Sequence, residues 1–174
     1  DILQLVGVSL AVLQGFVLLC GTRRRLASCA LGATVAVVLL TPAVWRVEWA
    51  SVAPLFVASY FTIATGSLFP LFPWAAYIFF GAALGAWFVV ARREHPALDA
   101  SRPFFLAGAA MFVASVVLSR VPLAPLGQTE FWTTSPNLFL AKAGAVLMLL
   151  SAAIRLTRSW TDAPKMATVL SRES

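Results

Sequence analysis

Charged residues and cysteine are scarce in this sequence. Only 11% of the 174 residues are charged, whereas a soluble domain carries about 25%, so an ordinary soluble domain is excluded. Intrinsic disorder is excluded as well, because 60% of the residues are apolar. The two cysteines, Cys20 and Cys29, lack the spacing of zinc ligands or of a disulfide framework. We therefore interpret them as buried structural residues and predict no metal site.

Residues that carry out catalysis are equally rare. The one histidine, His95, lies in the charged stretch Arg92-Arg93-Glu94-His95-Pro96, which is typical of a solvated loop. No metal-binding, redox, nucleophile-elbow or phosphate-loop motif occurs. The formal net charge of +6 would suggest nucleic acid as the partner of a soluble protein, but here the basic residues flank apolar stretches. We predict no catalytic residue and no nucleic-acid partner.

Five apolar stretches have the length of a transmembrane helix, which needs about 20 mostly apolar residues. Three of them open with proline, a residue that suits the first helical turn. The sequence begins without methionine, so we interpret it as part of a longer multi-pass protein. It predicts an all-α fold, a polytopic transmembrane helix bundle that forms a single membrane domain over 1–174 in a lipid bilayer. The predicted spans are 2–20, 26–45, 70–91, 103–121 and 136–156.

The distribution of basic residues predicts how these spans alternate. If the spans alternate, the other side of the membrane keeps only Arg46 and Arg120, with Lys142 inside the fifth span, and the first side collects ten basic residues. These ten are Arg23, Arg24, Arg25, Arg92, Arg93, Arg102, Arg155, Arg158, Lys165 and Arg172. Because basic loops favour the cytoplasm, we expect a cell (inner) membrane protein with its first residue outside and its last residue in the cytoplasm. If the sixth apolar segment, Val52–Ala64, crossed as well, the asymmetry would collapse. We predict a re-entrant or interfacial element there.

Tryptophan supports the same boundaries. Its ring is apolar and its N–H needs a polar partner, so tryptophan favours the membrane interface. We expect Trp87 and Trp160 at the inner boundary, and four others at the outer one: Trp45, Trp49, Trp74 and Trp132. The tail 163–174 is predicted to form a short cytoplasmic helix.

Five residues are candidates for a substrate-binding cleft at the outer boundary: Asp1, Gln4, Trp74, Tyr77 and Lys142. Asp1 and Gln4 lie about one helical turn apart, as do Trp74 and Tyr77, so each pair can present a common face. Lys142 lies about 9 Å inside the fifth span, where an ammonium group needs a partner, a polar cavity or a path to the surface. The alternative stays open that the aromatic residues are interface anchors and Lys142 snorkels.

Several motifs, in order along the chain, resemble one membrane enzyme family. The most distinctive is Phe69-Pro70-Leu71-Phe72-Pro73-Trp74, followed by Tyr77, Gly81 and Gly85, where the two glycines form a GxxxG step that lets another helix approach closely. The others are Asp1-Ile2-Leu3-Gln4 with Gly7, Phe131-Trp132 with Thr134-Ser135-Pro136, Leu140 and Gly144, and the terminal Leu170-Ser171-Arg172-Glu173-Ser174. Together they resemble the heparan-alpha-glucosaminide N-acetyltransferase family and its bacterial relatives.

The resemblance implies a multi-pass acyltransferase that moves an acetyl or acyl group from acyl-CoA to a sugar-like acceptor, with acetyl-CoA as co-substrate and no covalently bound cofactor. In that family a histidine acts as base or transient acyl carrier in a cavity between helices. That histidine belongs to an earlier part of the family's chain, and His95 does not match it. A family position that is usually basic corresponds to Lys142.

Two other classes of function compete with an enzyme. One is a non-catalytic, acyltransferase-like subunit that packs in a larger membrane complex or against a second copy, which the missing histidine favours. The other is a transporter, which is disfavoured because no span carries a glycine or proline break in its middle and no internal repeat occurs.

Overall fold

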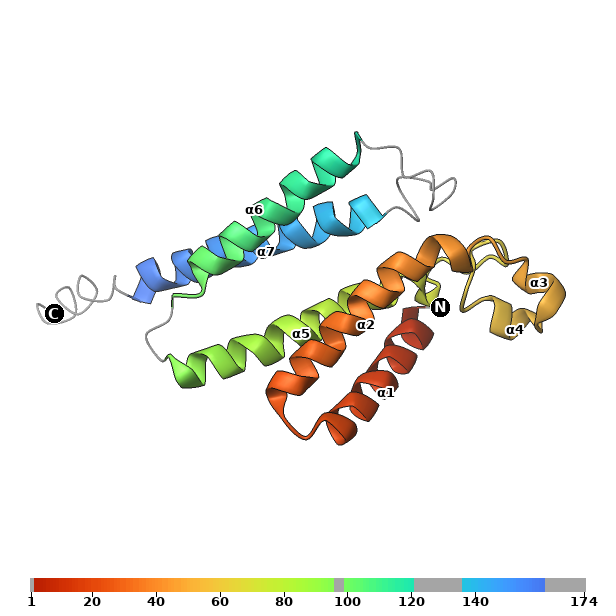
Figure 1. The fold of residues 1–174 in the computed structure, drawn as a ribbon, viewed down its shortest axis with the longest axis horizontal. Helices are drawn as coiled ribbons and strands as arrows, with labels where there is room; N and C mark the ends of the chain where they lie inside the picture. Colours follow the sequence, from red (N-terminus) through yellow and green to blue (C-terminus); the bar gives the residue numbers. More distant parts are fainter. Residues whose placement is uncertain (1, 96–98, 121–135, 162–174) are drawn as a thin grey trace, which may run out of the picture.

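The computed structural model describes residues 2–95, 99–120 and 136–161 (Figure 1). Within these ranges the regular structure is helical throughout, and five of the helices are long and apolar enough to cross a membrane. The predicted all-α, multi-pass fold is therefore confirmed. Helices of this length and hydropathy contact the hydrocarbon of a lipid bilayer.

The ends of the long helices differ in part from the predicted spans. They are α1 (Ile2–Cys20), α2 (Arg23–Val44), α5 (Leu71–Glu94), α6 (Ser101–Leu118) and α7 (Pro136–Thr161). Only α1 has the predicted bounds. α2 begins at Arg23, because the Thr22 side chain accepts a hydrogen bond from the backbone N–H of Arg25 and caps the helix. α5 and α7 continue beyond 91 and 156, because backbone hydrogen bonding does not stop where the apolar residues end.

The ambiguous segment between α2 and α5 does not span. It contains two helices of four residues each, α3 (Trp49–Val52) and α4 (Leu55–Ala58), followed by turns up to Gly66. Four helical residues rise about 6 Å, far less than the roughly 30 Å of a hydrocarbon core. Figure 1 shows both short helices beyond the ends of α2 and α5. The prediction of a non-spanning element is confirmed. The predicted tail helix, 163–174, lies outside the described residues.

Two tryptophans fix this segment to the long helices. The indole N–H of Trp45 donates to the backbone oxygen of Phe72 at 3.0 Å, and that of Trp49 donates to the oxygen of Val44 at 2.7 Å. The Phe72 oxygen is available because this residue precedes Pro73, which favours an extended backbone. We expected these indole groups to seek the wet interface. Their polar partners are carbonyl groups of the protein, and their place at the outer boundary stays a prediction.

α6 and α7 are antiparallel and interlock through small residues spaced seven apart. A Cβ added to Gly108 would lie 2.6 Å from the backbone oxygen of Gly144, so the two helices touch there through bare backbone. On either side a serine of one helix donates to a carbonyl of the other: Ser151 to Ser101 at 2.6 Å, and Ser115 to Asn137 at 2.7 Å. A seven-residue repeat suits two helices that wind slowly around each other.

α6 and α7 form one half of the described molecule. The other half consists of α2 and α5, which lie side by side, and of α1 beside them (Figure 1). α1 is mostly exposed, with Leu5, Ser9 and Cys20 as its buried residues. The halves meet in an apolar cluster of Val38, Ala76, Phe139 and Ala143, from α2, α5 and α7. No described helix approaches Gly81 or Gly85, where an added Cβ would meet open space. The close glycine contact is at Gly108 and Gly144.

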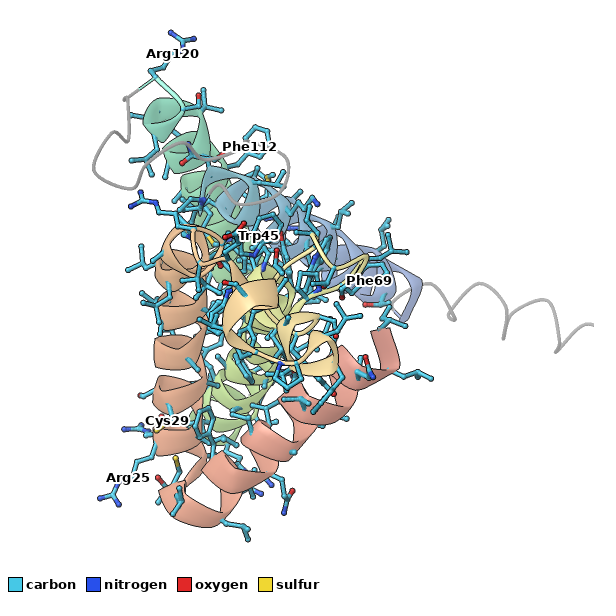
Figure 2. All side chains as sticks on the ribbon, turned by 90° about the vertical axis from the view of Figure 1, so that its right-hand side faces the viewer. Arg25, Cys29, Trp45, Phe69, Phe112 and Arg120 are labelled. Atoms are coloured by element: carbon cyan, nitrogen blue, oxygen red, sulfur yellow. The ribbon has the colours of Figure 1, made fainter. Side chains whose placement is uncertain are left out.

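The two cysteines lie where α1 turns into α2. Cys20 is buried and Cys29 is exposed, so the interpretation of both as buried residues is wrong for Cys29. Cys29 lies in the second turn of α2, on the outer surface of the bundle (Figure 2). The two Sγ atoms are 3.2 Å apart, which is a thiol hydrogen bond between the free cysteines.

Candidate functional site

A groove opens at the seam between the two halves, near the start of α1, α5 and α7. It is open on one side and has a volume of about 630 Å³, within the range of about 300–1,000 Å³ that ligand sites occupy. Its walls are apolar apart from Tyr77 and Lys142. We call it the aromatic groove. α1 contributes Ile2, Leu5 and Val6, the chain at α5 contributes Phe69, Trp74, Tyr77 and Ile78, and α7 contributes Lys142, Ala145 and Val146.

Aromatic rings form one wall of the aromatic groove. Phe69 meets Trp74 edge to face with ring centroids 5.4 Å apart, and Trp74 lies 5.9 Å from Tyr77. The Tyr77 ring in turn packs against the ring of Phe139 in α7, with centroids 5.0 Å apart, so the rings connect the two halves. The sequence produces this arrangement because Trp74 and Tyr77 are three residues apart in a helix. Figure 2 shows Phe69 at the end of the bundle that faces the viewer, beside the start of α1.

Lys142 brings the positive charge to the aromatic groove. Its Nζ lies 5.3 Å from the centroid of the Trp74 ring, within the distance of a cation–π contact. The Lys142 side chain is exposed and lies near the start of α7, on the same wall of the groove as Ala145. A cation on the edge of apolar walls can attract an anionic or polar group. The groove therefore suits a molecule with a polar head and an apolar body.

The structure brings together three of the five predicted site residues. Trp74, Tyr77 and Lys142 all line the aromatic groove. Gln4 is exposed and is not among the lining residues that the structure describes. Asp1 lies outside the described residues. The sequence reasoning missed the apolar wall of α1, because a mostly exposed helix of continuous apolar residues gives no sign of which face meets a neighbour.

The groove supplies binding groups rather than a complete catalytic set. Tyr77 and Lys142 are its ionisable lining residues in the described part of the chain. His95 lies at the opposite end of α5, where its backbone N–H donates to the oxygen of Ala91 and ends the helix. Within the described residues, no three side chains of histidine, cysteine, aspartate or glutamate gather as metal ligands would.

We compared the chain with models of protein families, with curated proteins and with solved structures. None of the three comparisons finds a match. The family resemblance of the motifs consequently remains a prediction, and the functional argument depends on the geometry of the groove.

Proposed function

We propose that the aromatic groove holds the acceptor substrate of a membrane acyltransferase, and that this chain is the substrate-binding part of that enzyme. One observation carries the proposal: Trp74, Tyr77 and Lys142, from helices far apart in the sequence, line one groove. Support also comes from the motifs, because these three residues lie in or beside the segments that resemble the acyltransferase family.

Each lining residue has a distinct role in this proposal. The ammonium group of Lys142 binds an oxygen of the acceptor or of the developing anion, and the contact with Trp74 holds it in place. The Tyr77 hydroxyl offers a hydrogen bond near the aromatic wall. Leu5 and Ile78 give an apolar surface for a lipid-like or alkyl portion of the substrate. The acceptor is therefore an amphipathic, sugar-like molecule.

The transfer itself follows ordinary acyl chemistry. The acceptor's amine or hydroxyl attacks the thioester carbonyl of acyl-CoA, a new C–N or C–O bond forms, and the C–S bond breaks to release the CoA thiol. The acceptor's proton passes to a base, and the carbonyl oxygen carries negative charge in between. Lys142 is suited to stabilise that charge. The base is supplied by another part of the intact protein, as the resemblance implies.

The proposal includes an orientation. The arginines at the starts of α2 and α6 and at the end of α5 lie at one end of the bundle, and the aromatic groove lies at the other. Since basic ends of spanning helices favour the cytoplasm, the groove opens on the outer side.

Substitution of Lys142 in the intact protein tests the function. Membranes that contain the Lys142→Ala variant should transfer a labelled acetyl group from acetyl-CoA to an alkyl glucosaminide about 10- to 100-fold more slowly, the usual cost of a lost charge-assisted bond. The Lys142→Arg variant should keep part of the rate. Arg120→Ala is the matched control, because Arg120 is an exposed cation at the same end outside the groove. Normal transfer by Lys142→Ala, or no transfer by the unsubstituted protein, contradicts the proposal.

A further inference from the structure

A second hollow lies at the opposite end of the bundle, between the start of α2 and the end of α5. It encloses about 480 Å³, with Arg24, Glu94 and His95 at its rim and Trp87 and Val90 deeper along α5. An adjoining hollow of about 370 Å³ shares Arg24, Val90 and Glu94 and adds Arg23 and Arg93. We call these two hollows together the basic groove.

The basic groove carries unneutralised positive charge. Arg24 forms an ion pair with Glu94, and both of these residues line both hollows. Arg23 and Arg93 form no ion pair with any residue that the structure describes. Arg25, although next in sequence, points away from the bundle and lines neither hollow (Figure 2). Two guanidinium groups on neighbouring helices are therefore available to the same anion.

Below its charged rim the basic groove becomes apolar. Trp87 precedes Glu94 by seven residues, which corresponds to about 10 Å along a helix. Between them Val90 and Ala91 form the wall, and Trp87 is 41% exposed. In a bilayer, a depth of this size leads from the headgroups to the first carbons of the acyl chains. Tryptophan prefers this interfacial region. The groove therefore offers cations and an apolar surface in the vertical order of a phospholipid.

We propose that the basic groove binds an anionic phospholipid, with its phosphate between Arg23 and Arg93 and the upper part of one acyl chain against Val90 and Trp87. A small free anion would use the arginines and leave the apolar wall without a role. A zwitterionic lipid would leave the excess positive charge unbalanced. The site does not depend on the acyl-transfer proposal, because the two grooves share no lining residue.

Lipid competition in the reconstituted protein tests this site. We compare the association of spin-labelled phosphatidylglycerol and phosphatidylcholine with the protein by electron paramagnetic resonance. The unsubstituted protein should prefer phosphatidylglycerol, and the Arg23→Gln, Arg93→Gln double variant should lose about tenfold or more of that preference. The matched control is Arg46→Gln, Arg120→Gln, which removes two exposed arginines from the other end and should leave the preference unchanged.

A second measurement locates the lipid without disturbing the arginines. Brominated phosphatidylglycerol at low mole fraction should quench part of the tryptophan fluorescence, and that part should disappear in the Trp87→Phe variant. Equal preference for both lipids, or an equal loss in the control variant, overturns the proposal. Displacement of the lipid by millimolar inorganic phosphate also overturns it, because the site would then recognise a free anion.

Discussion

The α6–α7 pair and helix α1 are held in the molecule in different ways. α6 and α7 touch through Gly108 and Gly144, and at each end of the contact one serine hydroxyl donates to a carbonyl of the partner helix. α1 makes mainly apolar contacts with α2 and α5, and its last residue, Cys20, adds a thiol hydrogen bond to Cys29 of α2. Its buried Ser9 is fully covered, yet the hydroxyl has no hydrogen-bond partner among the described residues. Directional contacts of the first kind specify a register more closely than apolar contacts do.

This difference matters for the aromatic groove, which lies between the two kinds of packing. Lys142 stands on the wall that is fixed by α6, while Leu5 and Val6 stand on the wall formed by α1. In a bilayer, lipid tails can replace apolar helix contacts at little cost, whereas close backbone packing and hydrogen bonds have no such substitute. We therefore infer that the charged wall is preorganised and that α1 is the side on which the groove would adapt to the proposed acceptor.

The largest effect is expected from filling the glycine contact. The Gly144→Leu variant should lose about 3 kcal/mol or more of stability, because a Cβ there would lie 2.6 Å from the Gly108 oxygen and 3.0 Å from the Phe112 nitrogen. The measurement is unfolding of the purified protein by titration with denaturing detergent. Gly32→Leu, at an open position on α2, is the control and should be neutral or slightly stabilising. Equal stability of the two variants would remove the distinction between the halves.

A smaller loss is expected from the serine that joins α7 to α6. The Ser151→Ala variant should be destabilised by about 1 kcal/mol, because the bond from its hydroxyl to the Ser101 oxygen is buried. Ser119→Ala is the matched control, since the Ser119 hydroxyl is exposed and bonds within its own helix. The same unfolding titration measures both variants. If they behaved alike, the interhelical bond would contribute nothing.

The smallest effect is expected on α1. The Ser9→Ala variant should be as stable as the unsubstituted protein or slightly more stable, because it removes a buried hydroxyl that has no described partner. Unfolding under the conditions used for Ser151→Ala gives the comparison. A loss as large as that of Ser151→Ala would show that the Ser9 hydroxyl makes a polar contact that holds the start of α1, and our account of an adaptable wall would be wrong.

Much of the fold follows from the sequence, because five runs of apolar residues and the placement of arginine leave few alternatives for a membrane chain. Helix ends were less predictable. Hydropathy shows which residues suit the hydrocarbon, whereas the start of α2 is set by the capping hydrogen bond of Thr22. The partner choice of glycines was not predictable. Gly81 and Gly85 have the familiar GxxxG spacing and remain open, whereas Gly108 and Gly144 stand in separate helices and are in contact.

The candidate site was predictable where local spacing decided it. Trp74 and Tyr77 share a face because they are three residues apart in α5, and the depth of Lys142 required a special environment. The cation–π contact between Lys142 and Trp74 was not predictable, because it depends on how α7 packs against α5. The basic groove was not predicted, because the arginines of α2 and α5 are far apart in the sequence and only the packing of the two helices brings them together.

The central claim is that Lys142 lies in a groove open to the outer side. The most direct test is to replace Lys142 by cysteine and to label that cysteine with a membrane-impermeant maleimide on intact cells. Lys142→Cys is compared with Ala110→Cys in a protein whose native cysteines are replaced by serine. Ala110 is exposed at the same level in the antiparallel register of α6 and α7 and lies outside the groove. We predict rapid labelling of the Lys142→Cys variant and almost none of the Ala110→Cys variant. Equal rates, or labelling at 142 only after the cells are opened, would contradict the account.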